Sequence, residues 1–324
     1  MHPLRVSSLL VLVLASCGGS TAPTETAPLA DRYPGDVNIE SDADVLFVEM
    51  GEQSSLAELF ARWSANSTGN SIALDASTAA PGSPGHQSIR LFTTAGPGGP
   101  GTVSTAMLYK AFANGYDGTI YTRWYVKYNS NGTFHHSGIR LGGNNPVSPN
   151  GPASPAGTLP TGSDFFSVGA ETSGAKTVPA ATSTFDFYNY WMHQRGTSFY
   201  PGQYFGNSFV NNPAVNIDLD TWNCIEVQLT LNDPVTGYSG EIAMWINGAE
   251  VARIKQGTTG TWDEDNFTPG PGAPFEGFQW RNDAALEFTY LQILHFVDND
   301  STGHVNSVNY DHVVVARKYI GPLK

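Results

Sequence analysis

The sequence predicts an all-β protein, folded as an antiparallel sandwich of two sheets with one short helix. Turn formers are abundant, with 35 glycines and 21 prolines among 324 residues, and they separate short runs of β-branched and aromatic residues. Apolar and polar residues alternate along several of these runs, which is the pattern of a strand with one buried face. Only one segment has clear helical spacing, so little helix is expected.

Residues 222–255 predict three consecutive antiparallel strands. Trp222–Leu231 alternates between an apolar face and a mixed face. Glu241–Ile246 and Ala249–Ile254 follow, joined by Asn247-Gly248, and both of these turn residues tolerate the positive φ of a two-residue hairpin. The three segments therefore predict a meander.

The one helical segment is Ser54–Trp63. Ser55 is placed to cap its first turn, with Glu58 three residues on. An apolar stripe on one side would rest on a sheet, and it comprises Leu56, Leu59, Phe60 and Trp63.

A long proline-rich segment, 144–161, is expected to be a loop, because a proline inside a central strand removes a ladder hydrogen bond. Loops of this length usually carry function or are disordered. It follows a cationic segment, and we expect it to border a groove there. Turn residues predict further loops at 81–85 and 96–101, and β-type runs predict further strands at 286–296 and 312–320.

Residues 118–128 predict a strand with two contrasting faces. One face is apolar enough for a core, whereas the other carries two phenols, a guanidinium and an ammonium. Aromatic rings beside fixed cations suit a groove that holds an acidic sugar chain. The polar face comprises Tyr121, Arg123, Tyr125 and Lys127, and the apolar face comprises Ile120, Thr122, Trp124, Val126 and Tyr128.

The N-terminus indicates export. Residues 1–16 are interpreted as a signal peptide, because Arg5 precedes an apolar run that is too short to span a bilayer. The run ends at Cys17 in a sequence that resembles a bacterial lipobox, so this cysteine is expected to carry lipid; an ordinary signal peptide with a chance cysteine is the alternative. Residues 17–32 predict a flexible tether. Residues 33–324 are then one domain, exported and anchored to the bacterial membrane, at the cell surface or in the periplasm, by lipid alone.

Charge and cysteine content limit the possible partners. The chain has a formal net charge of −13. Removal of residues 1–16 takes away one basic residue, Arg5, and leaves 15 basic and 29 acidic residues. Nucleic acid is therefore not expected as a partner. A local positive groove remains compatible, because six basic residues lie between positions 110 and 195. Cys224 lies in a strand pattern and is expected to be a buried thiol, with a catalytic thiol as the alternative.

Several segments together resemble the concanavalin A-like jelly-roll polysaccharide lyases that act on alginate and glucuronan. In that family a strand opened by Trp leads through a loop to a strand ending in Trp-x-x-Gly, as in 220–254, and the Arg-bearing strand is similar to IYTRWYVKY. FDFYNYWMHQR resembles the family's Tyr-x-Tyr strand, YFGN its Tyr-Gly step, and NYDHVVVARKYIGPL its closing strand. The resemblance covers most of residues 44–324 and implies a jelly-roll fold, a scaffold that lectins and non-catalytic sandwiches share.

The chain departs from the family where a Gly-Gly-Lys-Leu-Pro-Gly segment supplies a lysine. The corresponding stretch, 137–143, has Ile139 at that position and Arg140 next to it. Three explanations stay open: Arg140 and His136 substitute for the lysine, the substrate differs, or the protein binds a polysaccharide without cutting it.

A uronate lyase neutralises the C6 carboxylate and provides a base for the C5 proton and an acid for the leaving oxygen. Alternation places His136 and Arg140 on one face, with Gly138 between them leaving room for a ligand. The catalytic hypothesis assigns Arg140 to neutralisation, Tyr190 to proton transfer, and Tyr188 or His136 to support. Substrate-binding residues on the same concave face are expected to be Tyr121, Arg123, Tyr125, Lys127, Gln194 and Tyr204.

Two other functions stay open beside an acidic-polysaccharide lyase: a surface lipoprotein that binds carbohydrate without cutting it, and a structural lipoprotein. Buried tyrosines also hydrogen-bond in ordinary sandwich cores, so the polar face alone does not decide. No cofactor or catalytic metal is expected. Asp298-Asn-Asp300, with Asp311, resembles a calcium loop, although short acidic turns are usually only turns.

Overall fold

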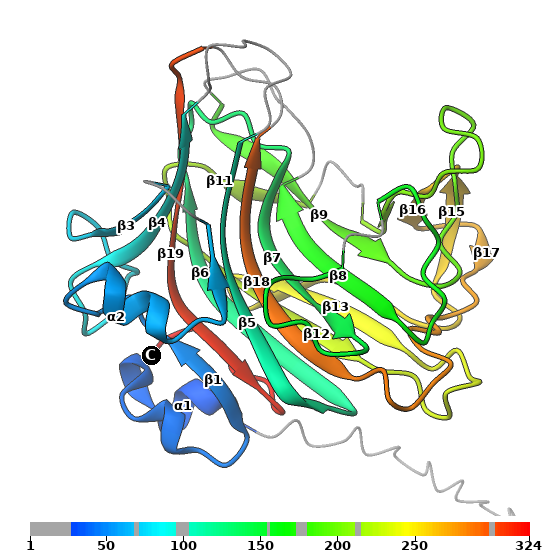
Figure 1. The fold of residues 1–324 in the computed structure, drawn as a ribbon, viewed down its shortest axis with the longest axis horizontal. Helices are drawn as coiled ribbons and strands as arrows, with labels where there is room; N and C mark the ends of the chain where they lie inside the picture. Colours follow the sequence, from blue (N-terminus) through cyan, green and yellow to red (C-terminus); the bar gives the residue numbers. More distant parts are fainter. Residues whose placement is uncertain are drawn as a thin grey trace, which may run out of the picture.

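The structure is a computed structural model that describes residues 27–67, 71–94, 104–153, 156–172, 180–210, 215–297 and 302–324. Two large sheets pack face to face over one apolar core, which confirms the predicted two-sheet jelly-roll sandwich (Figure 1). Within these ranges the strands pair antiparallel, apart from one short parallel contact between Ser208 and Asn266.

The smaller sheet contains eight of the described strands. Their bounds are β1 Val45–Glu49, β3 Ile72–Asp75, β4 Ser88–Thr94, β6 Thr119–Tyr128, β12 Asn223–Thr230, β13 Glu241–Ile246, β14 Ala249–Ile254 and β19 Val305–Ala316. The spatial order is β14-β13-β12-β6-β19-β4-β3, and β1 pairs with β19. The predicted meander of β12, β13 and β14 is confirmed, and Asn247 and Gly248 in its turn have φ of 52° and 82°.

The larger sheet contains eleven of the described strands. Their bounds are β2 Ala65–Asn66, β5 Ser104–Tyr116, β7 His136–Asn144, β8 Phe165–Thr172, β9 Thr182–Tyr190, β10 Asn207–Ser208, β11 Asn216–Asp218, β15 Thr259–Asp263, β16 Asn266–Pro269, β17 Ala273–Pro274 and β18 Phe288–Val297. The order is β17-β15-β16-β10-β9-β8-β7-β18-β5-β2, and β11 pairs with β9. Figure 1 shows β15, β16 and β17 as a separate extension at one side of this curved sheet.

The core fills the space between the two sheets. From the smaller sheet, Trp124 and Val126 on β6 are buried in it, and from the larger sheet Ile139 on β7 and Phe187 on β9 are buried in it. The apolar face predicted for 120–128 therefore faces the core, as alternation required. Each sheet has a second face that points away from this core, and any binding site on a sheet must lie on that outer face.

Helices are few and short in the described ranges. They are α1 Leu29–Arg32, α2 Leu56–Ala61, and the 3-10 turns η1 Pro34–Asp36 and η2 Ile39–Ser41. The predicted capped helix is confirmed as α2, where the Ser55 hydroxyl accepts the Glu58 backbone N–H at 3.3 Å. No helix in the described part of the chain is long and apolar enough to cross a membrane.

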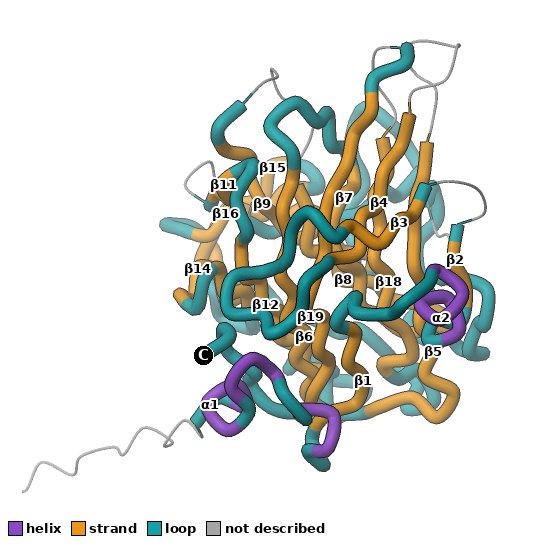
Figure 2. Tube along the Cα trace, turned by 90° about the vertical axis from the view of Figure 1, so that its left-hand side faces the viewer, coloured by secondary structure: helices purple, strands orange, loops and turns teal. Residues whose placement is uncertain are grey.

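The N-terminal boundary of the domain differs from the prediction. Leu29 and Ala30, expected in the tether, are buried, and their backbone N–H groups donate to Tyr319 O and Ile320 O at 3.1 and 2.9 Å. The short helix α1 thus docks beside the C-terminal segment (Figure 2). Composition gave no sign of this, because the partner carbonyls lie at the other end of the chain. Cys17 and the expected signal peptide, residues 1–16, lie outside the described residues.

Candidate functional site

A cleft of about 850 Å³ lies on the face of the larger sheet that points away from the core. Its floor comes from β5, β18, β7, β8 and β9, which are neighbours in that sheet. Two loops form its walls: the predicted proline-rich loop through residues 150–153 and 156, and the segment 197–205. The expectation that the 144–161 loop borders a groove is confirmed.

Strand register places the polar residues of the floor in one row across the sheet. Gln292 on β18 pairs with Arg140 on β7, Arg140 pairs with Gly169 on β8, and Gly169 pairs with Tyr188 on β9. Arg140 and Tyr188 are two strand spacings apart, about 10 Å. The glycine between them leaves open floor on which a ligand can lie between a guanidinium and a phenol.

A second row runs parallel to the first. Tyr290 pairs with Gly142, Gly142 pairs with Ser167, and Ser167 pairs with Tyr190. A Cβ on Gly142 would approach the Tyr290 hydroxyl to 2.5 Å, so only glycine lets that phenol lie over the strand. Tyr188 and Tyr190 stand together, with ring centroids 5.6 Å apart and nearly perpendicular planes.

Glu171 on β8 is a site residue that the sequence reasoning missed. Its carboxylate accepts a hydrogen bond from His136 Nδ1, and its other oxygen lies 3.6 Å from Arg140 Nη2. Burial alone would raise the pKa of Glu171, but His136 and Arg140 lower it below its ordinary value, so it stays ionised. The space expected for a ligand beside Gly138 belongs to Glu171, since a Cβ at 138 would meet Glu171 Cβ at 2.9 Å.

His136 and Arg140 share the cleft face, as alternation predicted. The His136 ring stacks on His135 at 4.0 Å and lies 4.8 Å from the Tyr188 ring. Because Nδ1 is held by Glu171, the ring orientation is fixed and Nε2 remains for a ligand.

Tyr188 is positioned by a loop beyond its own strand. The Gly206 backbone N–H donates to its hydroxyl at 3.0 Å, which links the Tyr-x-Tyr strand to the Tyr-Gly step. Burial, with Tyr190 and Glu171 nearby, raises the pKa of Tyr188, so the phenol keeps its proton at neutral pH.

Gln292 is a second residue that the sequence reasoning missed. It lines the cleft at 4% exposure, and its Oε1 is buried with no hydrogen-bond partner in the described structure. The same is true of Arg140 Nε. Buried polar atoms are normally paired, so two hydrogen bonds remain to be made here: Gln292 Oε1 can accept one and Arg140 Nε can donate one. No local pattern marked Gln292, which sits in an otherwise apolar strand.

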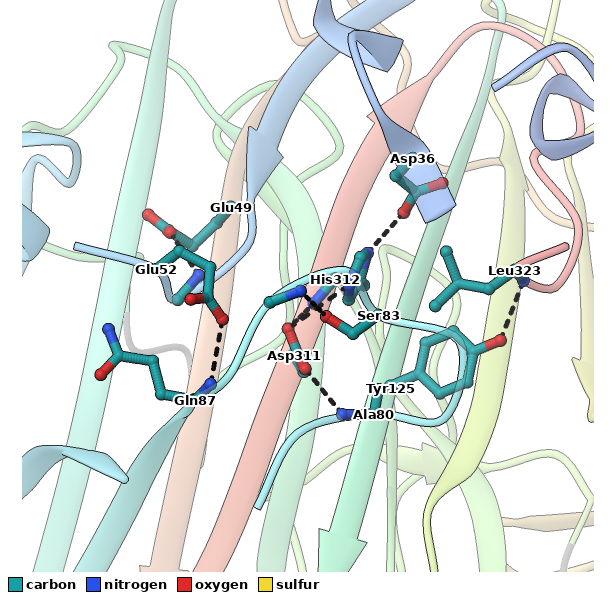
Figure 3. Close-up of polar contacts among 12 residues, drawn as sticks. Asp36, Glu49, Glu52, Ala80, Ser83, Gln87, Tyr125, Asp311, His312 and Leu323 are labelled. Carbon is teal, nitrogen blue, oxygen red and sulfur yellow. Dashed lines mark hydrogen bonds and ion pairs between the residues drawn. The ribbon is translucent and has the colours of Figure 1, made fainter. Parts of the chain in front are cut away.

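The expectation that the 121–127 face shares this groove is wrong. β6 belongs to the smaller sheet, and Tyr121, Arg123, Tyr125 and Lys127 point away from the core on the opposite side of the molecule. The N-terminal turns and the C-terminal segment cover that face, and Tyr125 Oη accepts the Leu323 N–H at 2.9 Å (Figure 3). Alternation assigns a residue to a face but does not say which sheet the strand joins.

Arg123 forms the centre of a sealed ionic cluster. It is fully buried and pairs with Asp36, which also accepts from His312 Nδ1 at 2.8 Å (Figure 3). Burial would raise the pKa of Asp36, but Arg123 and His312 lower it. His312 is in a β-bulge of β19 and has a φ of 48°, which turns its ring toward Asp36. A fully buried guanidinium cannot contact a polysaccharide.

Two further substrate-binding expectations are not met by the geometry. Gln194 lies beyond the end of β9, is buried, and accepts the Trp191 N–H through Oε1 at 3.2 Å. Tyr204 belongs to the wall loop, where its carbonyl accepts the Gly157 N–H at 2.7 Å, but the neighbouring Phe205 lines the cleft in its place.

The remaining candidates do not form a metal or thiol site in the described ranges. Asp298 and Asp300 of the calcium expectation lie outside these ranges, Asp311 accepts the Ala80 N–H at 2.8 Å, and no group of three potential ligands is found among the described residues. Cys224 is buried, and burial raises its pKa to about 12, which fits the small-hydrophobe interpretation.

Comparisons with known proteins give fold-level likenesses at low identity. No family model and no curated protein sequence matches the chain. It is similar to a mutant alginate lyase solved with an alginate tetrasaccharide, at 13% identity over 72% of this chain and 82% of that one, TM-score 0.47. It is also similar to an endo-β-1,4-glucuronan lyase from the fungus Trichoderma reesei (11%, 85% and 96%, 0.47) and to an alginate lyase from Chlorella virus (12%, 76% and 93%, 0.48).

Proposed function

We propose that this protein is a polysaccharide lyase that cleaves a uronate-containing polymer by β-elimination in the cleft of the larger sheet. The observation that carries the proposal is the convergence of Arg140, His136 and two tyrosines over a glycine floor, with the buried Glu171 carboxylate behind them. Each step of the reaction has a side chain of suitable chemistry within this group.

Arg140 is proposed to bind the C6 carboxylate of the uronate. A cation there withdraws charge from the carboxylate and makes the C5 proton more acidic. Gln292 lies beside it in the same row and adds a polar contact. Ile139, at the position of the family lysine, is buried in the core, whereas Arg140 next to it faces the cleft. This supports Arg140 as the substitute for that lysine.

His136 is proposed as the base and Tyr190 as the acid, with Tyr188 assisting. His136 Nε2 removes the C5 proton, the C5–H electrons form the C4–C5 double bond, and the C4–O4 bond breaks. Tyr190 donates its proton to O4, which becomes the hydroxyl of the departing sugar, and solvent returns the proton from His136 to the phenolate. The sequence-based hypothesis gave His136 only a supporting role; the Glu171–His136 pair favours it as the base.

The test is ultraviolet absorbance of the unsaturated uronate, measured while the purified domain is mixed with alginate, glucuronan and related polymers. Arg140→Ala and Tyr190→Phe are each expected to lower the rate about 100-fold or more. Unchanged rates in both would remove these assignments. Retardation in a polysaccharide-containing gel without any rise in absorbance would instead favour the non-catalytic carbohydrate-binding lipoprotein.

We also propose that the protein is exported and held at a membrane through lipid on Cys17. The support is the sequence around that cysteine and the tether that follows it. Cys17→Ser is expected to move the protein from the membrane fraction of the expressing bacterium to the soluble fraction. An unchanged distribution would contradict the anchor.

A further inference from the structure

The row of floor residues that contains Arg140 and Tyr188 continues across the sheet. Tyr188 on β9 pairs with Ser208 on β10, and Ser208 pairs with Asn266 on β16. Asn266 therefore lies four strands from Arg140 on β7, which is about 20 Å at about 4.8 Å per strand. A 4-linked sugar chain advances by roughly one strand spacing per sugar, so a chain that lies along this row reaches β16 with the fourth sugar from Arg140.

Two exposed aromatic side chains stand at the β16 end of the cleft. Residues 264–265 form the turn before β16, and Ser198 N donates to Glu264 Oε1 in this turn at 3.0 Å. The two residues that follow Ser198 are Phe199 and Tyr200, which are 77% and 45% exposed, and both line the cleft together with Glu264. The rings therefore lie about four sugars from the proposed reaction centre.

The exposure of these rings distinguishes them from the other apolar side chains. Among the described residues, Phe199 is the most exposed of the large hydrophobic side chains. Its ring centroid lies 4.6 Å from that of Tyr200, and Tyr200 lies 5.1 Å from Phe205, which also lines the cleft. Aromatic rings offer a large contact surface at low conformational cost, and a sugar ring can stack on them through its C–H groups.

The loop that carries the rings, residues 196–206, is held in place by contacts within the protein, and we call it the aromatic loop. The Asn207 side chain accepts the Arg195 N–H at 2.8 Å and donates to the Arg195 carbonyl at 2.9 Å, which closes the base of the loop. The Tyr204 carbonyl accepts the Gly157 N–H at 2.7 Å, which joins the loop to the other wall of the cleft. A preformed surface loses less entropy on binding, as expected of a subsite.

The contact at this end of the cleft does not depend on a cation. Glu264 and Asp265 line it, whereas Arg195 stacks 4.1 Å over Trp262 and lines a separate cavity. A sugar here would meet aromatic rings, and its hydroxyl groups could donate to the two carboxylates. Neither contact requires that this sugar be acidic.

We propose that Phe199 and Tyr200 form a distal subsite, which binds a sugar ring four positions along the chain from the uronate held by Arg140. This subsite rests on the proposed function and deepens it, because it sets the length of chain that the protein cuts well. If the distal sugar lies on the same side of the broken bond as the uronate, about six sugars are needed to span the bond and both sites. If it lies on the other side, about five are enough.

The test measures cutting against chain length with the purified full chain. The substrates are size-separated oligosaccharides of glucuronan and of polymannuronate, from about three to about eight sugars long, and ultraviolet absorbance reports cutting. We expect kcat/KM to rise about tenfold or more between about four and about six sugars and to change little beyond that. A rise that is complete at about four sugars, or no rise at all, would overturn the proposal.

Variants assign the rise to the aromatic rings. In the aromatic double variant, Phe199→Ala with Tyr200→Ala, kcat/KM on the longest oligosaccharides should fall about tenfold. The same variant should keep kcat/KM within about twofold of the parent on substrates of about four sugars, which are too short to reach from Arg140 to the rings. An equal fall on short and long substrates, or no fall on either, counts against the subsite.

Two single variants serve as matched controls. Tyr200→Phe keeps the ring and should keep the dependence on length. Phe92→Ala removes a half-buried ring from β4 of the smaller sheet, outside the cleft, and should leave the rates on short and long substrates unchanged. If Phe92→Ala lowered the rate on long substrates as much as the aromatic double variant, the effect could not be assigned to the rings in the cleft.

The position of the cut gives a second measurement. In oligosaccharides of about seven sugars labelled at one end, the parent should prefer the bond whose cleavage places a sugar on the rings. The aromatic double variant should spread its cuts over the neighbouring bonds. The same product lengths from both proteins would contradict the subsite.

The outcomes separate this subsite from the proposed lyase activity. If no polymer is cut, but a polysaccharide-containing gel retards the parent and retards the aromatic double variant much less, the subsite stands and the lyase activity falls. If polymers are cut and the aromatic double variant matches the parent at every length, the lyase activity stands and the subsite falls. If no polymer is cut and none retards the protein, both fall.

Discussion

Two clusters of the same composition lie on opposite faces of this molecule, one sealed and one open. Arg123, Asp36 and His312 meet on the outer face of the smaller sheet, and their side chains are at most 2% exposed. Arg140, Glu171 and His136 meet in the cleft; there the carboxylate is again buried, but the arginine and the histidine are 21% and 19% exposed.

The two clusters contain the same residue types, so composition does not decide whether such a cluster is structural or able to contact a ligand. What decides it is whether other segments of the chain cover the cluster. The N-terminal turns and the C-terminal segment close over the first cluster, so its charges can satisfy only one another and hold those segments to the sheet. The second cluster stays open because it lies on the floor of the cleft, where Gly169 places no side chain between Arg140 and Tyr188. Both arginines leave guanidinium nitrogens without a partner among the described residues, but only Arg140 faces a cavity.

The largest expected effect is on stability, at the sealed cluster. Arg123→Ala leaves the Asp36 carboxylate buried beside a single histidine, and breaking a buried pair in this way costs about 3–5 kcal/mol. Denaturant unfolding measures the loss. The double variant Arg123→Met with Asp36→Asn should recover much of it, since no lone charge remains. A loss below about 1 kcal/mol in Arg123→Ala would mean that the cluster does not hold the fold.

Arg140→Ala should show the opposite pattern at the open cluster. We expect kcat/KM to fall about 100- to 1000-fold, which is the effect of removing one charge-stabilising donor. Unfolding free energy should stay within about 1 kcal/mol of the parent, because Glu171 keeps His136. Loss of stability without loss of turnover would reverse the roles of the two clusters.

The contribution of the sealed face to the unfolding free energy should also depend on pH, between about pH 4.5 and 7. Glu226 accepts the Ile320 and Gly321 N–H groups at 2.7 and 2.8 Å, and burial raises its pKa from 4.5 to about 7. The pKa of Glu226 is higher in the folded protein than in the unfolded chain, so protonation of Glu226 stabilises the folded state. This contribution is complete below pH 4.5, the unfolded pKa, and is lost as the pH rises through the folded pKa of about 7. Titration of Glu226 alone should therefore lower the unfolding free energy by about 3 kcal/mol across that interval.

Glu226→Gln is the variant that checks this window. Its unfolding free energy should vary less over the same interval, keeping only the smaller slope of Asp311, whose pKa burial raises to about 6. The lowered pKa of Asp36 and that of Glu171 act in acid, where stability is lost as pH falls through the folded values. An identical slope in Glu226→Gln would assign the titration to another group.

The smallest expected effect is at Lys127. It lies half-buried on the outer face of β6, away from the cleft. Lys127→Ala should change unfolding free energy by less than about 0.5 kcal/mol and leave turnover unchanged. A substantial loss of polysaccharide binding in Lys127→Ala would instead show that the outer face of the smaller sheet binds the ligand.

The sequence predicted elements and faces well because those properties are local. The meander at 222–254, the helix capped by Ser55, and the shared face of His136 and Arg140 all follow from spacings of a few residues. The assignment of a strand to a sheet is not local. Arg123 finds Asp36 from 87 positions away. No periodicity in either segment records that contact.

The candidate site shows the same limit. Glu171 reaches His136 because β7 and β8 pair in a register that brings it opposite Gly138, and that register depends on the loops between the strands. The exposed rings of Phe199 and Tyr200 belong to a loop whose shape is set by Asn207 and Glu264, not by its own sequence. Residues of this kind can be recognised as site residues only once the three-dimensional positions of the neighbouring strand and turn are known.

The Asn207 side chain, which joins both backbone groups of Arg195, has a consequence for how this protein can change over time. It closes the base of the aromatic loop, so a substitution, insertion or deletion between the two ends leaves β9 and β10 where they are. The loop residues that line the cleft can then vary, while Arg140, His136, Tyr188 and Tyr190 stay on their strands. Under the proposed function, polymer preference and bond cleavage would therefore depend on separate parts of the chain.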